Sequence, residues 1–245
     1  MKTYFDLSNI HPSWHKWIEI AMQHMDANYL QQLSESNDWL PGPQHIFNAF
    51  SLPVDDTHYI MFGESPYPRA VSANGYAFWD ENVTDIWSPL GLSKQVNRAT
   101  SLRNMIKMLL VAEHLLTPNA TDQTAIANID KSALVKTNAQ FFGNFIEKGF
   151  LLLNASLVLR DSNKRKDAKA WQPFIATILD FICKIRPQTQ LVLFGQIANE
   201  ITPLLPAQLS KRFYAEHPYN ISFIQNPEVI SFFQPLRLLR INPGK

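Results

Sequence analysis

The 245-residue sequence has one cysteine and no long apolar run. Cys183 has no second cysteine to bond, which excludes an internal disulfide, and its neighbours Phe181, Ile182 and Ile185 at helical spacing predict a buried thiol. No uninterrupted apolar stretch approaches the roughly 20 residues that a membrane-spanning helix needs. The first residues lack the charged-then-apolar pattern of a signal peptide. We therefore expect a cytoplasmic protein with no membrane association.

An excess of charge of one sign is also lacking. The formal net charge is +1, from 22 basic and 21 acidic residues, so composition alone does not point to nucleic acid. A binding groove needs only local positive charge, and the sequence has one dense basic run, made up of Arg160, Lys164, Arg165, Lys166 and Lys169. The favoured interpretation of this run is a solvated surface loop. The seven histidines are scattered and no Cys/His pair has ligand spacing, so we expect no metal and no cofactor.

Apolar residues make up 46% of the sequence, enough for the full core of one domain. Short apolar runs predict four strands, at 59–62, 150–154, 190–194 and 212–215. Apolar residues at helical spacing predict helices over about 13–34, 46–50, from Thr100 or Ser101 to before Pro118, 133–148 and 171–185. Helices alternating with continuous apolar strands predict a single monomeric α/β domain over 1–245. Its three α/β/α layers would surround a central four-stranded, mainly parallel sheet.

Each predicted strand ends in a polar or turn-forming group. These ends are Gly63-Glu64-Ser65, Asn154, Gly195-Gln196 and His217, and the aromatic residues Tyr67 and Phe78 follow the first of them. Taken singly, a turn-forming asparagine or a structural histidine is the commoner interpretation. The carboxyl ends of parallel strands share one edge of a sheet, so we expect all four groups to line one cleft. Such a cleft would hold an amide for base recognition, aromatic rings for stacking and an imidazole for acid or electrostatic work.

The order and content of these motifs resemble the uracil-DNA glycosylases of the mitochondrial, bacterial and herpesvirus type, from about Ser13 to Leu239. The family's Gly-Gln-Asp-Pro-Tyr-His corresponds to Gly63-Glu64-Ser65-Pro66-Tyr67-Pro68, and its later phenylalanine motif to Gly75-Tyr76-Ala77-Phe78. Its Ser-Leu-x-Asn, Leu-Leu-Leu-Asn and Trp-x-x-Phe correspond to 101–104, 151–154 and 171–174. Its His-Pro-Ser-Pro-Leu-Ser corresponds to His217-Pro218-Tyr219-Asn220-Ile221-Ser222.

The resemblance implies base-excision DNA repair on uracil-containing DNA, single- or double-stranded, with the base flipped out of the stack. Phe78 would stack on uracil, Asn154 would pair with its edge, and Tyr67 would crowd C5 and reject thymine. His217 would stabilise the uracil anion as it leaves. The resemblance also implies a DNA-binding set in which Ile221 is the apolar wedge and the others contact or flank phosphates: Ser101, Gly195, Gln196, Ile221 and Ser222.

Among the positions that depart from the family pattern, three bear on water activation and phosphate binding. Ser65 stands where the family keeps the aspartate that positions water, and a neutral hydroxyl supplies no negative charge; Glu64 next to it is a candidate substitute. Pro68 replaces a histidine, and Gln196 replaces a small serine. Three hypotheses stay open: a uracil-DNA glycosylase with weakened water activation, a catalytically silent DNA-, base- or partner-binding protein on the same fold, and a glycosylase with altered base preference.

Overall fold

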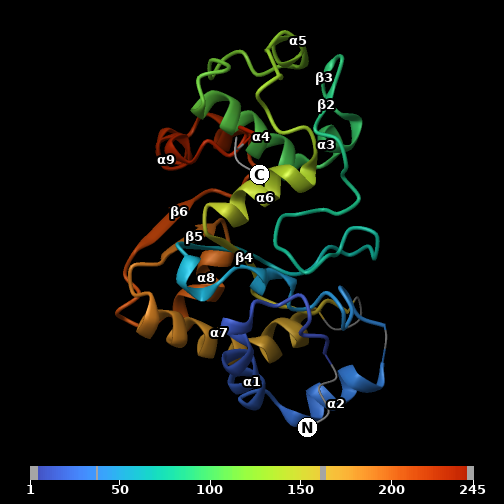
Figure 1. Cartoon of the computed structure of the whole chain (residues 1–245), viewed down its shortest axis with the longest axis vertical. Helices are drawn as coiled ribbons and strands as arrows, with labels where there is room; N and C mark the ends of the chain where they lie inside the picture. The colour runs from blue at the N-terminus through green and yellow to red at the C-terminus, as the bar shows by residue number, and fades with distance from the viewer. Residues whose placement is uncertain (1–4, 37, 161–163, 242–245) are drawn as a thin grey trace. The chain divides into compact units, whose positions relative to one another are not determined.

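The computed structural model describes residues 5–36, 38–160 and 164–241. The chain forms two compact units, each assembled from two stretches. Unit 1 takes the described residues of 1–80 and 149–214, and unit 2 those of 81–148 and 215–245. Figure 1 labels the helices and strands of both units.

The central sheet has the strand order β4-β1-β5-β6. Its strands are β1 (Tyr59–Gly63), β4 (Phe150–Asn154), β5 (Gln190–Phe194) and β6 (Arg212–Ala215). The middle strand β1 pairs in parallel with both β4 and β5. All five residues of β4 are buried, as are the three central residues of β1. A strand covered on both faces reads as a continuous apolar run, which explains the lack of alternation in the sequence.

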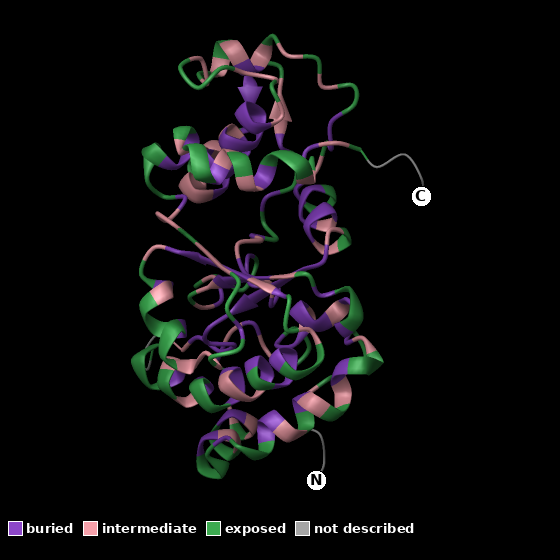
Figure 2. Ribbon diagram, turned by 90° about the vertical axis from the view of Figure 1, so that its left-hand side faces the viewer, coloured by how far each residue is buried: buried purple, intermediate pink, exposed green. Residues whose placement is uncertain are grey.

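Helices α1 (His15–Gln23), α2 (Ala27–Glu35), α7 (Lys164–Ile185) and α8 (Ile197–Ile201) complete unit 1. Helix α1 packs against α7, as Figure 1 shows. The aromatic core beside them includes Trp14, whose ring lies edge-on to Phe50 and Phe181 with centroids 5.0 and 5.9 Å away. In Figure 2 the buried centre of the sheet is purple, whereas β6, whose residues are intermediate or exposed, is not, and the helices carry green, exposed patches.

Unit 2 contains a small hairpin and most of the remaining helices. The hairpin joins β2 (Trp87–Ser88) to β3 (Gly91–Leu92). The helices are α3 (Lys94–Arg98), α4 (Thr100–Ala112), α5 (Gln123–Ala127), α6 (Asn138–Glu147) and α9 (Pro227–Phe233). Helix α4 packs against α9 and against the 3-10 helix Ile221–Gln225. It therefore backs the segment that follows His217.

The predicted fold class is confirmed: a central four-stranded, mainly parallel sheet is flanked by helices. The four predicted strands lie where the apolar runs place them, and Cys183 is a buried free thiol. Within the described ranges, no helix is long and apolar enough to cross a membrane.

Three helix predictions and one loop prediction need correction. The helix predicted over 13–34 is two helices, because Asp26 leaves helical geometry and its carboxylate caps α2 by accepting from the Tyr29 N–H at 2.8 Å. Helix α4 begins at Thr100, but its N-cap is Ala99, so neither Thr100 nor Ser101 caps it. Helix α6 begins at Asn138, five residues later than predicted, after a Thr137 capping box. The basic run from Lys164 forms the exposed first turns of α7 rather than a loop.

Candidate functional site

The carboxyl ends of β1 and β4 lie side by side in unit 1. Gly63 is directly opposite Asn154 in the parallel register. Beyond the strands, the Ala155 N–H donates to the Gly63 carbonyl at 2.8 Å, and the Ser156 N–H to the Glu64 carbonyl at 3.0 Å. The loop after β1 is thus hydrogen-bonded to the loop after β4. The shared edge predicted for Gly63, Asn154 and Gly195 follows from the parallel pairing of all three strands.

Because Gly63 has no side chain, the Asn154 amide can occupy the space beside it. A Cβ atom at position 63 would lie 2.5 Å from Asn154 Oδ1 and 2.8 Å from the Cβ of Ala77. Asn154 itself is only 3% exposed. Among the residues that the structure describes, none hydrogen-bonds its side-chain amide. Its donors and acceptors can therefore pair with the edge of a ligand.

Tyr67 and Phe78 are joined by a hydrogen bond. The Tyr67 hydroxyl donates to the Phe78 carbonyl oxygen at 3.0 Å. One residue earlier, the Ala77 N–H donates to the Leu152 carbonyl of β4 at 3.0 Å. Phe78 has a left-handed backbone with φ of 66°, and its ring lies 6.2 Å from that of Phe194 at an interplanar angle of 77°. The two predicted aromatic residues therefore lie beside the strand that carries Asn154.

Burial raises the pKa of the Tyr67 phenol, and the nearby Asp80 carboxylate raises it further. Asp80 is itself almost fully buried and pairs with Arg69 at 3.1 Å, whose charge opposes the shift. Tyr67 consequently stays a neutral hydrogen-bond donor well above neutral pH.

The loop between Gly63 and Tyr67 exposes Glu64 and half-buries Ser65. Burial raises the pKa of Glu200 in α8, and the negative charge of Glu64 adds to that shift. The Glu64 carboxylate is therefore within electrostatic reach of α8. Gly195 follows β5 with φ of 63°, and the exposed Gln196 accepts a hydrogen bond from the Asn199 amide at 2.8 Å.

The other predicted residues belong to unit 2. Ser101 lies half-buried in the first turn of α4, and three residues later Asn104 is 1% exposed. The Asn104 amide donates to the carbonyl oxygens of Pro218, Tyr219 and Asn220 at 2.8, 3.3 and 3.4 Å. The motif at 101–104 is thus hydrogen-bonded to the loop after His217. The sequence analysis includes Asn104 in this motif but assigns it no role.

The His217 imidazole acts as a hydrogen-bond acceptor. Its Nδ1 accepts a hydrogen bond from the Tyr219 backbone N–H at 3.1 Å. A neutral imidazole that accepts at Nδ1 carries its proton on Nε2. The side chains of Ile221 and Ser222 that follow are exposed, Ile221 by 70%.

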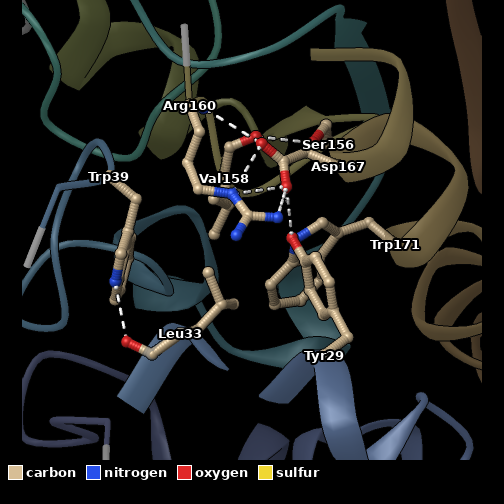
Figure 3. A network of polar contacts seen from close by, with 8 residues as sticks. All are labelled: Tyr29, Leu33, Trp39, Ser156, Val158, Arg160, Asp167 and Trp171. Atoms are coloured by element: carbon tan, nitrogen blue, oxygen red, sulfur yellow. Dashed lines mark hydrogen bonds and ion pairs between the residues drawn. The ribbon is translucent and has the colours of Figure 1, made fainter. Parts of the chain in front are cut away.

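Figure 3 shows a buried polar network in unit 1 that holds Arg160, six residues after Asn154, against Asp167. Arg160 donates through its backbone N–H and its guanidinium to the Asp167 carboxylate, at 2.6 Å for the closest pair, Nη2 and Oδ1. The Tyr29 hydroxyl donates to the same carboxylate at 2.9 Å, and the Trp171 indole donates to Tyr29 at 3.1 Å. Asp167 is fully buried. The sequence interpretation missed this network because it read Arg160 only as part of a basic run.

No family model matches the chain. Its structure matches the crystal structure of the wild-type UNG from Nitratifractor salsuginis with a TM-score of 0.91 and 38% sequence identity, over 96% of this chain and 95% of that one. A uracil-DNA glycosylase of Amoebophilus asiaticus is 26% identical over 219 residues, covering 86% of this chain and 84% of the relative. The uracil-DNA glycosylase of mimivirus matches at 16% identity and a TM-score of 0.57, a likeness of fold alone.

Proposed function

The chain belongs to the uracil-DNA glycosylase family, and from that membership we propose that it flips uracil out of DNA and hydrolyses the N-glycosidic bond in base-excision repair. The observation that carries the proposal is Asn154, a buried amide with no hydrogen-bond partner among the described residues, at the carboxyl end of β4. Its substrate is uracil-containing DNA. The silent-binding alternative is not favoured by the relatives.

The pocket would recognise uracil through three side chains of unit 1. Asn154 Oδ1 would accept from uracil N3–H while its Nδ2 donates to O4, a match that cytosine cannot make. Phe78 would stack on the flipped base, and the ring of Tyr67 would occupy the space of a C5 methyl. The hydrogen bond between Tyr67 and the Phe78 carbonyl supports this arrangement because it fixes the two aromatic residues relative to one another.

His217 would stabilise the departing base. In the reaction the C1′–N1 bond breaks with its electron pair left on uracil, a water oxygen bonds to C1′, and a water proton leaves. The Nε2–H of a neutral His217 would donate to uracil O2, where the negative charge develops. The hydrogen bond from the Tyr219 N–H to Nδ1 supports that tautomer.

Water activation would be the weak part of the site. The Ser65 hydroxyl can orient a water molecule but is no base at neutral pH, and Pro68 offers no side-chain hydrogen bond. Glu64 would be the nearest source of negative charge for the sugar cation. We therefore propose slow turnover, carried mainly by stabilisation of the leaving group.

The rest of the binding surface is proposed from the motifs. Ser101, Gly195, Gln196 and Ser222 would contact or flank phosphates, and Ile221 would fill the emptied stack. The exposure of Ile221 is what such a wedge requires. A monomeric, cytoplasmic protein acting as one domain over 1–245 completes the proposal.

The test is uracil excision from a single-stranded oligonucleotide, measured as abasic sites at stoichiometric protein. We expect slow product formation by the wild type and about 100-fold less by Asn154→Ala, since two hydrogen bonds at roughly 1.5 kcal/mol each are lost. His217→Ala should lower the rate about 10²- to 10³-fold. Asn119→Ala, the same change at an exposed loop position, is the matched control and should leave the rate unchanged.

Ser65→Asp should raise the rate, because it restores negative charge beside the sugar. An unchanged or lower rate would show that loop geometry, not the missing carboxylate, limits turnover. Tight binding of uracil-DNA without any abasic product would refute the enzymatic proposal in favour of a silent binding protein. A panel of modified bases in the same assay tests altered base preference.

A further inference from the structure

The segment after His217 presents two large apolar side chains to solvent. Tyr219 is 67% exposed and Ile221 is 70% exposed. Across the described ranges, the other exposed large apolar side chains are spread singly along the chain: Val71, Leu90, Ile185, Tyr214 and Ile241. Scattered single exposures need no explanation, whereas Tyr219 and Ile221 place an aromatic ring and an aliphatic side chain on the same exposed loop, two residues apart.

The backbone under these side chains is firmly held. The buried Asn104 amide donates to three successive carbonyl oxygens, those of Pro218, Tyr219 and Asn220. On the other side of the loop, the 3-10 helix Ile221–Gln225 buries Phe223 and Ile224 and packs against α4. A rigid loop that holds an aromatic ring out in water loses little conformational entropy when the ring meets a partner.

A separate hydrogen bond couples Tyr219 to His217. The Tyr219 N–H donates to His217 Nδ1 at 3.1 Å, so the imidazole orientation and the Tyr219 backbone are fixed together. The segment is a turn, closed by a hydrogen bond from the Asn220 N–H to the His217 carbonyl oxygen at 2.9 Å, so Tyr219 lies closer to His217 than the roughly 7 Å that two extended residues would span. Successive bases on one DNA strand are about 3.4 Å apart. If His217 contacts the flipped uracil, Tyr219 lies within one or two base steps of it.

We propose that Tyr219 is a base-stacking residue, whose ring stacks on a nucleobase neighbouring the flipped uracil while Ile221 fills the vacated position. This inference rests on the proposed function. The partner is a nucleobase rather than a phosphate because the exposed surface is a flat ring beside an aliphatic side chain. Every base has a π-face, so the contact strengthens DNA binding without selecting sequence.

Binding to a uracil oligonucleotide with 2-aminopurine next to the uracil tests the proposal. Tyr219→Ala should weaken binding about five- to 150-fold, and the fluorescence quenching that the wild type causes on binding should be lost. Tyr219→Phe should retain both affinity and quenching. Leu90→Ala removes an exposed apolar side chain from the turn between β2 and β3 and is the control expected to change neither.

Two results would overturn the inference. Equal affinity and quenching for wild type and Tyr219→Ala would show that the ring does not stack. A Tyr219→Phe variant as weak as Tyr219→Ala would assign the contact to the hydroxyl, as expected for a phosphate contact. Both readouts report binding, so they remain valid if the wild type produces no abasic sites, which would count only against the proposed hydrolysis.

Discussion

Replacing Asp167 with asparagine should destabilise the protein by about 3–5 kcal/mol, the usual cost of removing one partner of a buried ion pair. Asp167 is fully buried and is the shared acceptor for the Arg160 guanidinium, the Arg160 backbone N–H and the Tyr29 hydroxyl. Asparagine keeps the shape and one acceptor oxygen but leaves the Arg160 charge, whose side chain is 15% exposed, without a counter-ion. Domains of this kind have total stabilities of about 5–15 kcal/mol, so the loss is a large fraction of the total.

Urea denaturation followed by tryptophan fluorescence measures the effect, and the same helix supplies a matched control. Asp180 pairs with Lys184 one turn later in α7, but the two side chains are 56% and 69% exposed. Asp180→Asn should therefore cost no more than about 0.5 kcal/mol. A similar loss of stability in both variants would refute the expectation that the cost of Asp167→Asn arises because Asp167 is buried.

A double variant separates charge from packing. Changing Arg160 to methionine together with Asp167 to leucine removes both charges and fills the site with apolar atoms. Replacement of a buried pair in this way is often neutral or stabilising, so much of the lost stability should return. If the double variant is less stable than Asp167→Asn, the network stabilises through its shape and hydrogen bonds rather than through charge compensation.

Two further predictions concern Gly63 and two tyrosines. Gly63→Ala places a Cβ against Asn154 Oδ1 and should lower the free energy of unfolding by about 1–3 kcal/mol and slow excision. Its control is Gly143→Ala in α6, where a Cβ meets nothing within 4 Å, and which should stabilise the protein by about 0.5–1 kcal/mol; equal effects of the two changes would contradict the close approach of Gly63 to Asn154. Burial raises the pKa of Tyr67 and Tyr29, so between the ordinary value of 10 and the higher folded value the native state binds more protons than the unfolded state. The free energy of unfolding should therefore fall as pH rises above 10, and it should fall less steeply in Tyr67→Phe and in Tyr29→Phe. Denaturation measured over a range of alkaline pH gives this slope, and variants with the same slope as the wild type would contradict the raised tyrosine pKa values.

The strands and their ends could be predicted because their signals are local. The runs at 59–62 and 150–154 are apolar throughout since both faces of the strands are buried, and each ends at a glycine or asparagine. Helix ends depend on single side chains instead. Asp26 and Thr137 each cap the start of a helix, and the spacing of apolar residues does not identify either position as a helix start.

The supporting contacts could not be predicted because they join residues far apart in sequence. Tyr29 and Asp167 are separated by 138 positions, and Asn104 and Pro218 by 114. A motif comparison identifies Asn104 as part of a pattern, but only the structure gives the carbonyl oxygens that it binds. Buried polar side chains such as these need partners, and sequence does not reveal which partners they find.

The Tyr67 hydroxyl helps to hold Phe78 in a backbone conformation that is costly for a residue other than glycine. A left-handed backbone costs roughly 1–2 kcal/mol at a residue other than glycine, and Phe78 adopts it at φ of 66°. The Ala77 N–H is bonded to β4 just before Phe78, and the Tyr67 hydroxyl is bonded to the Phe78 carbonyl just after the strained torsion. Two hydrogen bonds at about 1 kcal/mol each offset that cost. A phenylalanine at position 67 would keep the ring but lose the hydrogen bond to the Phe78 carbonyl oxygen, so it is the hydroxyl that fixes the backbone of Phe78 relative to Tyr67.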